Sequence, residues 1–306
     1  MKISVFDAHC DTITRCLATG EGLFANGGMV ALDRTANAFE NYCQVFALYA
    51  DCAEPEHPTY QDLLACFRRE MEANRTYIVP CATAVQAETA NRQGKAAAFL
   101  SVEGAELLDC DPDRLPQAAA DGVLSINLTW NHANALCGAH CDRPEQGLTE
   151  RGFRFLDRMG ALGILADVSH LSEPGFWDVM EHSRLPVIAS HSNAKILCGH
   201  TRNLTDEQIT AIINNQGIIG LNFFHLFLGG EKDLNTVRAH LDHILELGGA
   251  RAAALGGDWD GCTTIEALPE ITALTDLYEY LLSCGYGETL LRQVFYKNLM
   301  DVVSKR

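Results

Sequence analysis

The sequence predicts an α/β fold, a single (β/α)8 TIM-type barrel that forms one domain over residues 1–306. Two observations support this prediction: short apolar runs recur eight times along the chain, and segments with helical signals separate them. With 306 residues, 47% of them hydrophobic, the chain can bury one large core without disulfide staples. Barrels routinely use this length as one domain, and the sequence contains no linker or internal repeat.

The eight apolar runs are the predicted strands. Their residues do not alternate between apolar and polar, which is typical of parallel strands buried on both faces. The runs are 3–6, 45–49, 96–102, 123–128, 163–168, 186–189, 218–222 and 252–256. A doubly wound open sheet is the competing fold, but no Gly-x-Gly-x-x-Gly motif follows a strand to support it.

Helical signals lie between these runs. In residues 59–77 apolar positions recur every three or four residues, so they form one face of a helix. Thr205 begins a capping box, and Ser172 is a cap residue that precedes a proline in the first turn. Residues 234–247 and 274–282 are further helix candidates.

Charge and cysteine content exclude several classes of protein. The chain carries 23 basic and 40 acidic residues, a net charge of −17, so we expect neither nucleic acid nor a membrane surface as a partner. The 12 cysteines are scattered and form no Cys-x-x-Cys pair, which indicates reduced thiols. No secretion signal or long apolar segment is evident, so the expected location is cytoplasmic. A homodimer is one assembly that such a chain could form.

Residues capable of metal chemistry follow most of the predicted strands. In a parallel barrel the carboxyl ends of the strands converge on one mouth, where the active site is built. These residues are His9 and Asp11 after the first run, Glu103 after the third, Trp130, Asn131 and His132 after the fourth, His170 after the fifth, His191 after the sixth, and Asp258 after the eighth. Random scatter of 11 histidines would rarely give this distribution.

The ligand types indicate a hydrolytic metal site. Imidazoles and carboxylates without thiolates are typical of zinc hydrolases. His9 and Asp11 are two residues apart, so in an extended strand they project to the same side. Glu103 could bridge two ions with its two oxygens, and His170 and His191 would complete the second. Two such ions can activate one water and polarise an amide carbonyl.

Six motifs in order resemble the membrane (renal) dipeptidase family, a branch of the amidohydrolase-like metal-dependent barrels. The resemblance covers essentially the whole chain, and Arg202 lies eleven residues after His191, as in the family pattern. The motifs are Asp7-Ala8-His9-Cys10-Asp11-Thr12, Ser101-Val102-Glu103-Gly104, Asp167-Val168-Ser169-His170, Ser190-His191-Ser192, Thr201-Arg202-Asn203-Leu204 and Gly257-Asp258-Trp259-Asp260-Gly261.

The resemblance implies a dipeptidase with two zinc ions per chain and a small peptide as substrate. One ion would be held by His9, Asp11 and Glu103, and the other by Glu103, His170 and His191. Arg202 would face the carboxylate of the peptide, and Asp258 would transfer protons. The animal members of the family are secreted and lipid-anchored, so a bacterial-type cytoplasmic relative fits this chain better.

Two departures from the family pattern concern the substrate. Leu-Thr-His after the fourth strand reads Leu-Thr-Trp here, with Trp130 in place of the imidazole that contacts the scissile group. His132, two residues on, would reach the substrate if the backbone stays extended. Asn-Phe-Tyr after the seventh strand reads Asn-Phe-Phe, which removes a hydroxyl but leaves Asn222 as a predicted substrate contact.

Other interpretations remain open at this point. The mouth could hold its polar groups without a metal, Asp258 could support a ligand histidine, and Arg202 could pair with a helix-capping acid. The enzyme could also hydrolyse another amide, a lactam or an N-acyl amino acid. A catalytically weak, peptide-binding paralogue has Trp130 as its only support.

Three further features are expected to be structural. Cys10 lies between two ligands but points to the other side of the strand, so we expect it to pack in the core. The segment 137–141 contains two cysteines and a histidine but offers no fourth ligand, which favours an ordinary loop. His240 and His243 are expected on the solvated face of a helix.

Overall fold

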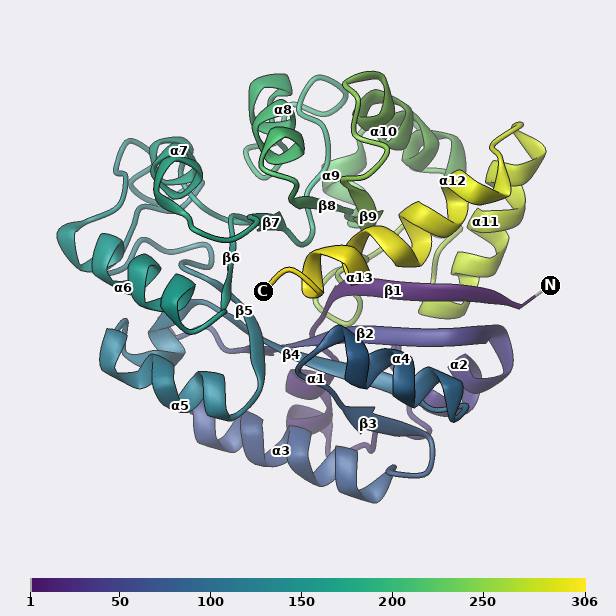
Figure 1. The fold of residues 1–306 in the computed structure, drawn as a ribbon, viewed down its shortest axis with the longest axis horizontal. Helices are drawn as coiled ribbons and strands as arrows, with labels where there is room; N and C mark the ends of the chain where they lie inside the picture. The colour runs from purple at the N-terminus through teal and green to yellow at the C-terminus, as the bar shows by residue number, and fades with distance from the viewer. Residues whose placement is uncertain (1) are drawn as a thin grey trace.

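The structure, a computed structural model that describes residues 2–306, confirms the predicted barrel (Figure 1). Eight parallel strands pair side by side, and the pairings of β1 with β9 and of β2 with β4 close the sheet on itself. In order around the barrel they are β1 (Ile3–Cys10), β2 (Phe39–Tyr49), β4 (Ala96–Glu103), β5 (Val123–Asn127), β6 (Leu165–Asp167), β7 (Ile188–Ala189), β8 (Ile218–Leu221) and β9 (Ala253–Leu255). Each lies in one of the eight predicted runs or extends it.

A ninth strand was not predicted. This strand, β3 (Ile78–Pro80), pairs with the first part of β4, whereas β5 pairs with the last part. Since β2 pairs with β4 along its length, β3 and β5 share the opposite edge. Three residues that end in proline are too short to show a period, which is why the sequence pattern does not reveal β3.

Helices surround the barrel and connect successive strands (Figure 1). Among residues 2–306 none of them combines the length and the apolar character needed to cross a lipid bilayer. They are α1 (Thr12–Thr19), α2 (Leu32–Ala38), α3 (Tyr60–Ala73), α4 (Ala84–Arg92), α5 (Leu115–Ala120), α6 (Glu150–Ala161), α7 (Glu173–His182), α8 (Asp206–Asn214), α9 (His225–Leu228), α10 (Leu234–Glu246), α11 (Leu274–Ser283), α12 (Glu288–Arg292) and α13 (Asn298–Val303), with short helical turns η1 (Ala105–Leu108), η2 (Pro112–Arg114), η3 (Ile271–Ala273) and η4 (Gln293–Lys297).

The predicted helix starts are confirmed. Thr59 caps α3 and Thr205 caps α8, each through a capping box in which side chain and backbone satisfy each other's hydrogen bonds. Ser172 caps α7 by accepting from the backbone N–H of Gly175. The two remaining predicted helices correspond to α10 and α11.

The core has two layers that leave one end of the barrel for the site. The larger apolar cluster includes outward-facing strand residues and the helices that pack on them. The smaller cluster fills the barrel interior, where Phe6 stacks on Phe99 with ring centroids 5.2 Å apart. Leu299 and Met300 of α13 pack on this cluster, next to the first residues of β6, β7 and β8. Helix α13 therefore covers the amino-terminal end, and polar groups collect at the carboxyl end.

Candidate active site

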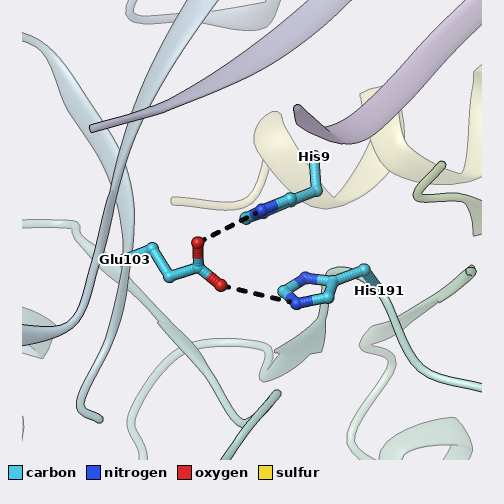
Figure 2. Close-up of side chains that lie close together, drawn as sticks. All are labelled: His9, Glu103 and His191. Atoms are coloured by element: carbon cyan, nitrogen blue, oxygen red, sulfur yellow. Dashed lines mark ion pairs between the residues drawn. The ribbon is translucent and has the colours of Figure 1, made fainter. Parts of the chain in front are cut away.

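The predicted metal ligands converge from four parts of the barrel. His9 lies near the end of β1 and Glu103 is the last residue of β4, while His170 and His191 follow β6 and β7. Figure 2 shows the imidazoles of His9 and His191 next to each other, each directed at one carboxylate oxygen of Glu103. Asp11 follows β1 and precedes α1. All five residues are buried, so the barrel holds them in fixed directions.

The two carboxylate oxygens of Glu103 face separate groups of ligands. Oε2 lies 3.4 Å from His9 Nε2, which in turn is 3.5 Å from Asp11 Oδ2. Oε1 lies 3.0 Å from His170 Nε2 and 3.5 Å from His191 Nε2, and those two nitrogens are 2.9 Å apart. Glu103 thus contacts ligands through both of its oxygens, and His9, Glu103 and His191 are also close enough together to hold one ion.

These residues fit a metal ion. His9 Nε2 and Asp11 Oδ1 are buried and have no hydrogen-bond partner, which is costly unless another group binds them. Burial lowers the pKa of His170 and of His191, so both imidazoles are neutral and present a lone pair. Burial raises the pKa of Glu103 to about 7, and the nearby charge of Asp11 adds to the shift, although His9 opposes it. A bound cation would stabilise this group of carboxylates.

Neighbouring polar groups hold the ligand imidazoles in place. Asn131 Oδ1 lies 2.9 Å from His170 Nδ1, and Ser190 Oγ lies 2.7 Å from His191 Nδ1. Asp167, at the end of β6, accepts hydrogen bonds from the backbone N–H groups of Ser169 and Ser190. Metal-binding histidines usually have such a partner on the second ring nitrogen.

Asp7 anchors the strand that carries His9, a role that the sequence analysis missed. Its buried carboxylate accepts hydrogen bonds from Gln44 Nε2 at 3.0 Å, the backbone N–H of His9 at 3.1 Å, the backbone N–H of Gly257 at 3.0 Å and Trp259 Nε1 at 3.1 Å. The contacts join β1 to β2 and to the loop after β9. Asp7 is the first residue of the first family motif, and this position is the signal in the sequence that could have identified it.

Asp258 lies at the edge of the first ligand group. Its Oδ1 is 3.9 Å from His9 Nε2, and its backbone adopts a left-handed conformation with φ of 59°. Burial raises the pKa of Asp258. Because His9, Asp11 and Asp258 are also close enough to hold one ion, the geometry permits Asp258 as a ligand as well as a proton carrier. A Cβ on Gly261 would lie 2.0 Å from Asp11 Oδ2, so a larger residue there would displace the Asp11 carboxylate.

Asn222 lies behind Asp258 and does not face the cavity. Its Nδ2 donates to Asp258 Oδ2 at 3.1 Å and to the carbonyl oxygen of His191 at 3.3 Å. The side chain is fully buried and is not part of the cavity wall. The prediction that Asn222 contacts substrate is therefore wrong: because it follows a barrel strand and points inward, it orients the aspartate.

Arg202 lies in the wall of a cavity of about 830 Å³ that also exposes Glu103 and Asp258. It is 4% exposed, and its guanidinium donates to Ser192 Oγ and to the carbonyl oxygen of His191. Its Nε has no partner, and no carboxylate of residues 2–306 forms an ion pair with it. This contradicts pairing with a helix-capping acid. Burial lowers the pKa of Arg202 to about 10 although the charges of Asp258 and Glu103 oppose the shift, so the group remains a cation.

Trp130 and His132 have different positions. Trp130 lines the cavity and packs against Tyr49, with ring centroids 5.0 Å apart. The His132 side chain is 52% exposed, and its Nε2 lies 3.9 Å from Asp51 Oδ1, outside the cavity. The prediction that His132 reaches the substrate is therefore wrong, because the backbone bends after β5 and the two-residue period is lost. On the same loop, the imidazole that lines the cavity is that of His140.

The other structural expectations had mixed outcomes. Cys10 packs in the larger apolar cluster, as predicted. His240 is fully buried: it accepts from the backbone N–H of Ala194 and its Nε2 bonds to the carbonyl of Leu228, so its predicted solvent exposure is wrong. The segment 137–141 is a loop, but the expectation that it plays no part in the site fails for His140.

A barrel with imidazoles and carboxylates gathered around one shared carboxylate at the carboxyl ends of its strands defines a metal-dependent hydrolase. Comparison with known proteins identifies the family. The model of the membrane dipeptidase family, peptidase family M19, matches residues 1–306, so the chain belongs to that family and is a metallo-dipeptidase.

Individual proteins are similar to this chain over most of their length. A Klebsiella pneumoniae protein described as "Uncharacterized protein in pqqA 5'region" is 34% identical over 235 residues, which cover 73% of this chain and 87% of the relative. A metallopeptidase from Rhodobacter sphaeroides, whose crystal structure is liganded with a phosphinate mimic of the dipeptide L-Ala-D-Ala, has a TM-score of 0.91 and 28% identity and covers 100% of this chain and 99% of its own. The probable dipeptidase PvdM from Pseudomonas aeruginosa shares the fold, with a TM-score of 0.89, 16% identity and coverage of 99% and 95%.

Proposed function

We propose that the chain hydrolyses dipeptides with the help of two zinc ions that share the carboxylate of Glu103. The observation that carries this proposal is the position of Glu103, whose Oε2 lies 3.4 Å from His9 Nε2 and whose Oε1 lies 3.0 Å from His170 Nε2. Imidazole and carboxylate ligands without thiolates support zinc in a hydrolytic role. The metallopeptidases that the chain resembles also support a metal.

The ligands divide between the two proposed ions. His9 and Asp11 would hold one ion together with Glu103 Oε2, and His170 and His191 would hold the other together with Glu103 Oε1. When bound, a zinc pair supplies a water that is nucleophilic at neutral pH and polarises the scissile carbonyl.

Asp258 is the proposed proton carrier. Its Oδ2 accepts from Asn222, which leaves Oδ1 as the oxygen that faces the ligands. Oδ1 would take a proton from the attacking water and return it to the nitrogen of the departing amine. Burial raises the pKa of this carboxyl group, which favours its protonated form between the two steps. Asn222 keeps the carboxylate turned toward the cavity.

The proposed substrate is a dipeptide with a free α-carboxylate. The Arg202 guanidinium is buried, cationic and unpaired, and it lines the same cavity as Glu103. A carboxylate that enters the cavity would receive charge-assisted hydrogen bonds from it. The phosphinate mimic of L-Ala-D-Ala in the Rhodobacter sphaeroides structure supports a D residue at the carboxyl side of the substrate.

Metal analysis combined with a substrate panel tests the proposal. We expect two zinc ions per chain in metal-replete protein, and hydrolysis of L-Ala-D-Ala or L-Ala-L-Ala that a chelator abolishes. A single ion would contradict the shared carboxylate. Preference for N-acyl amino acids or lactams would instead support the second amide hydrolase, and absence of any metal-dependent turnover would support a peptide-binding paralogue.

We also propose the cytoplasm as the compartment. All 12 cysteines are free thiols, and two of them, Cys141 and Cys284, are exposed. Exposed thiols persist in reducing compartments, which supports this location. Fractionation of the source cells would test it, with recovery in an oxidising compartment as the contrary result.

A further inference from the structure

His140 connects a metal ligand to the segment that carries Arg202. The imidazole lies on the loop between β5 and α6, in the cavity wall. Its Nε2 is 2.9 Å from Asn131 Oδ1, and the same oxygen is 2.9 Å from Nδ1 of the ligand His170. Its Nδ1 is 2.7 Å from Oγ1 of Thr201, the residue before Arg202. The backbone N–H of His140 also donates to the carbonyl of His170 at 2.8 Å.

The direction of these hydrogen bonds follows from the ligand role of His170. A neutral imidazole has one N–H donor and one acceptor nitrogen, so if Nε2 of His170 offers its lone pair to a metal, Nδ1–H must donate to Asn131 Oδ1. That oxygen can accept a second bond, which comes from His140 Nε2–H. Nδ1 of His140 is then the acceptor for the hydroxyl of Thr201. This arrangement of donors and acceptors satisfies all three hydrogen bonds.

The opposite polarity would impair the metal site. If the amide of Asn131 were flipped, its NH2 group would face both imidazoles, and His170 would carry its proton on Nε2, where the metal binds. His140 opposes the flip in its Nε2–H tautomer, in which Asn131 Oδ1 is the acceptor for Nε2–H and Nδ1 accepts from the Thr201 hydroxyl. In this arrangement one ring nitrogen of His140 donates and the other accepts, as in a neutral imidazole.

We propose that His140 is a positioning residue that keeps His170 in its metal-binding tautomer and fixes the segment bearing Arg202 relative to the metal site. The inference rests on the metal site of the proposed function. Both nitrogens of His140 are engaged, so it is neither a ligand nor a proton carrier here. His140 places an imidazole in the same part of the cavity wall as Trp130. The ring centroids of Trp130 and His140 lie 6.3 Å and 6.0 Å from that of His170.

Two substitutions separate hydrogen bonding from ring packing and from proton chemistry. His140→Phe keeps the shape of the ring but loses both hydrogen bonds. In His140→Gln the side-chain NH2 can donate to Asn131 while the carbonyl oxygen accepts from Thr201, and the residue cannot titrate. His132→Phe is the matched control, because it makes the same change on the same loop at a side chain outside the cavity.

The readouts are metal affinity, measured by competition with a chelator, and KM for a dipeptide and its amide. We expect His140→Phe to weaken one of the two metal sites by about 10- to 100-fold and to raise KM for the dipeptide but not for the amide. His140→Gln should restore most of the metal affinity and most of the parent KM for the dipeptide. His132→Phe should have the same metal affinity and KM as the parent. Thr201→Val should raise KM for the dipeptide alone, which provides a test even if His140→Phe does not fold.

Each contrary result has a distinct meaning. If His140→Phe behaves like the parent, or His140→Gln is as impaired as His140→Phe, the positioning role is refuted while the metal-dependent activity of the parent stands. If Thr201→Val leaves KM unchanged, the link to Arg202 is refuted. A parent chain that binds no metal would instead refute the proposed function, and the tautomer argument with it.

Discussion

Replacing Arg202 by lysine tests whether the buried guanidinium binds the substrate carboxylate. The structure provides a cation that is 4% exposed, has an unpartnered Nε and lines the cavity beside Glu103. Lysine keeps the positive charge but replaces the planar fork of donors with a point charge, so about one charge-assisted hydrogen bond to the carboxylate is lost. Such a bond contributes about 1.5–3 kcal/mol, which corresponds to a decrease in kcat/KM of roughly 10- to 150-fold.

The assay is a cycle with two enzymes and two substrates. Parent and Arg202→Lys proteins are compared on L-Ala-D-Ala and on its C-terminal amide, with zinc content measured for each preparation. The amide lacks the carboxylate, so it should be a poor substrate for the parent. Its kcat/KM should therefore change little on the substitution. Equal losses on the two substrates, at unchanged zinc content, would refute carboxylate binding by Arg202 and indicate a structural role.

Four other substitutions give independent predictions. Asp258→Asn should retain zinc, measured by elemental analysis, and lower kcat by about 10²- to 10⁴-fold, whereas loss of zinc would identify Asp258 as a ligand. Glu103→Gln should reduce the content of both zinc ions at once, and loss of only one would contradict a shared carboxylate. His132→Ala should leave turnover within about twofold of the parent, because its side chain is exposed outside the cavity. Asp7→Asn should lower the free energy of unfolding in urea by about 2–6 kcal/mol, since its NH2 group would face the N–H donors of Gly257 and Trp259, and a smaller change would show that the site rearranges.

The metal ligands could be predicted because barrel geometry fixes where strands end. Each of the eight apolar runs identified a barrel strand, and in a parallel barrel the position after a strand determines the end of the molecule on which a side chain lies. His9, Glu103, His170 and His191 needed no further information than this order. Their assignment to two groups came from the two oxygens of one carboxylate and from the resemblance to the family.

Residues whose partners are distant in the sequence could not be predicted in the same way. The carboxylate of Asp7 is satisfied by donors from β2 and from the loop after β9, and neither is adjacent to it in the chain. Asn222 was assigned to substrate because it begins the family's Asn-Phe-Tyr motif, but the motif does not reveal that its side chain contacts Asp258. The helical period placed His240 on α10 but did not reveal that the loop after β7 covers it.

The loop after β5 shows where the strand-end argument stops being valid. As long as the backbone is extended, residues two apart share a side, and that rule linked His132 to Trp130. The backbone bends at this point, so His132 turns outward and the loop returns to the cavity at His140. A loop is positioned by the hydrogen bonds that it forms. In this loop the backbone N–H of His140 donates to the carbonyl oxygen of His170, and Asn131 Oδ1 lies 2.9 Å from His170 Nδ1. The histidine closest to the expected position in sequence is therefore not the one that the fold brings to the site.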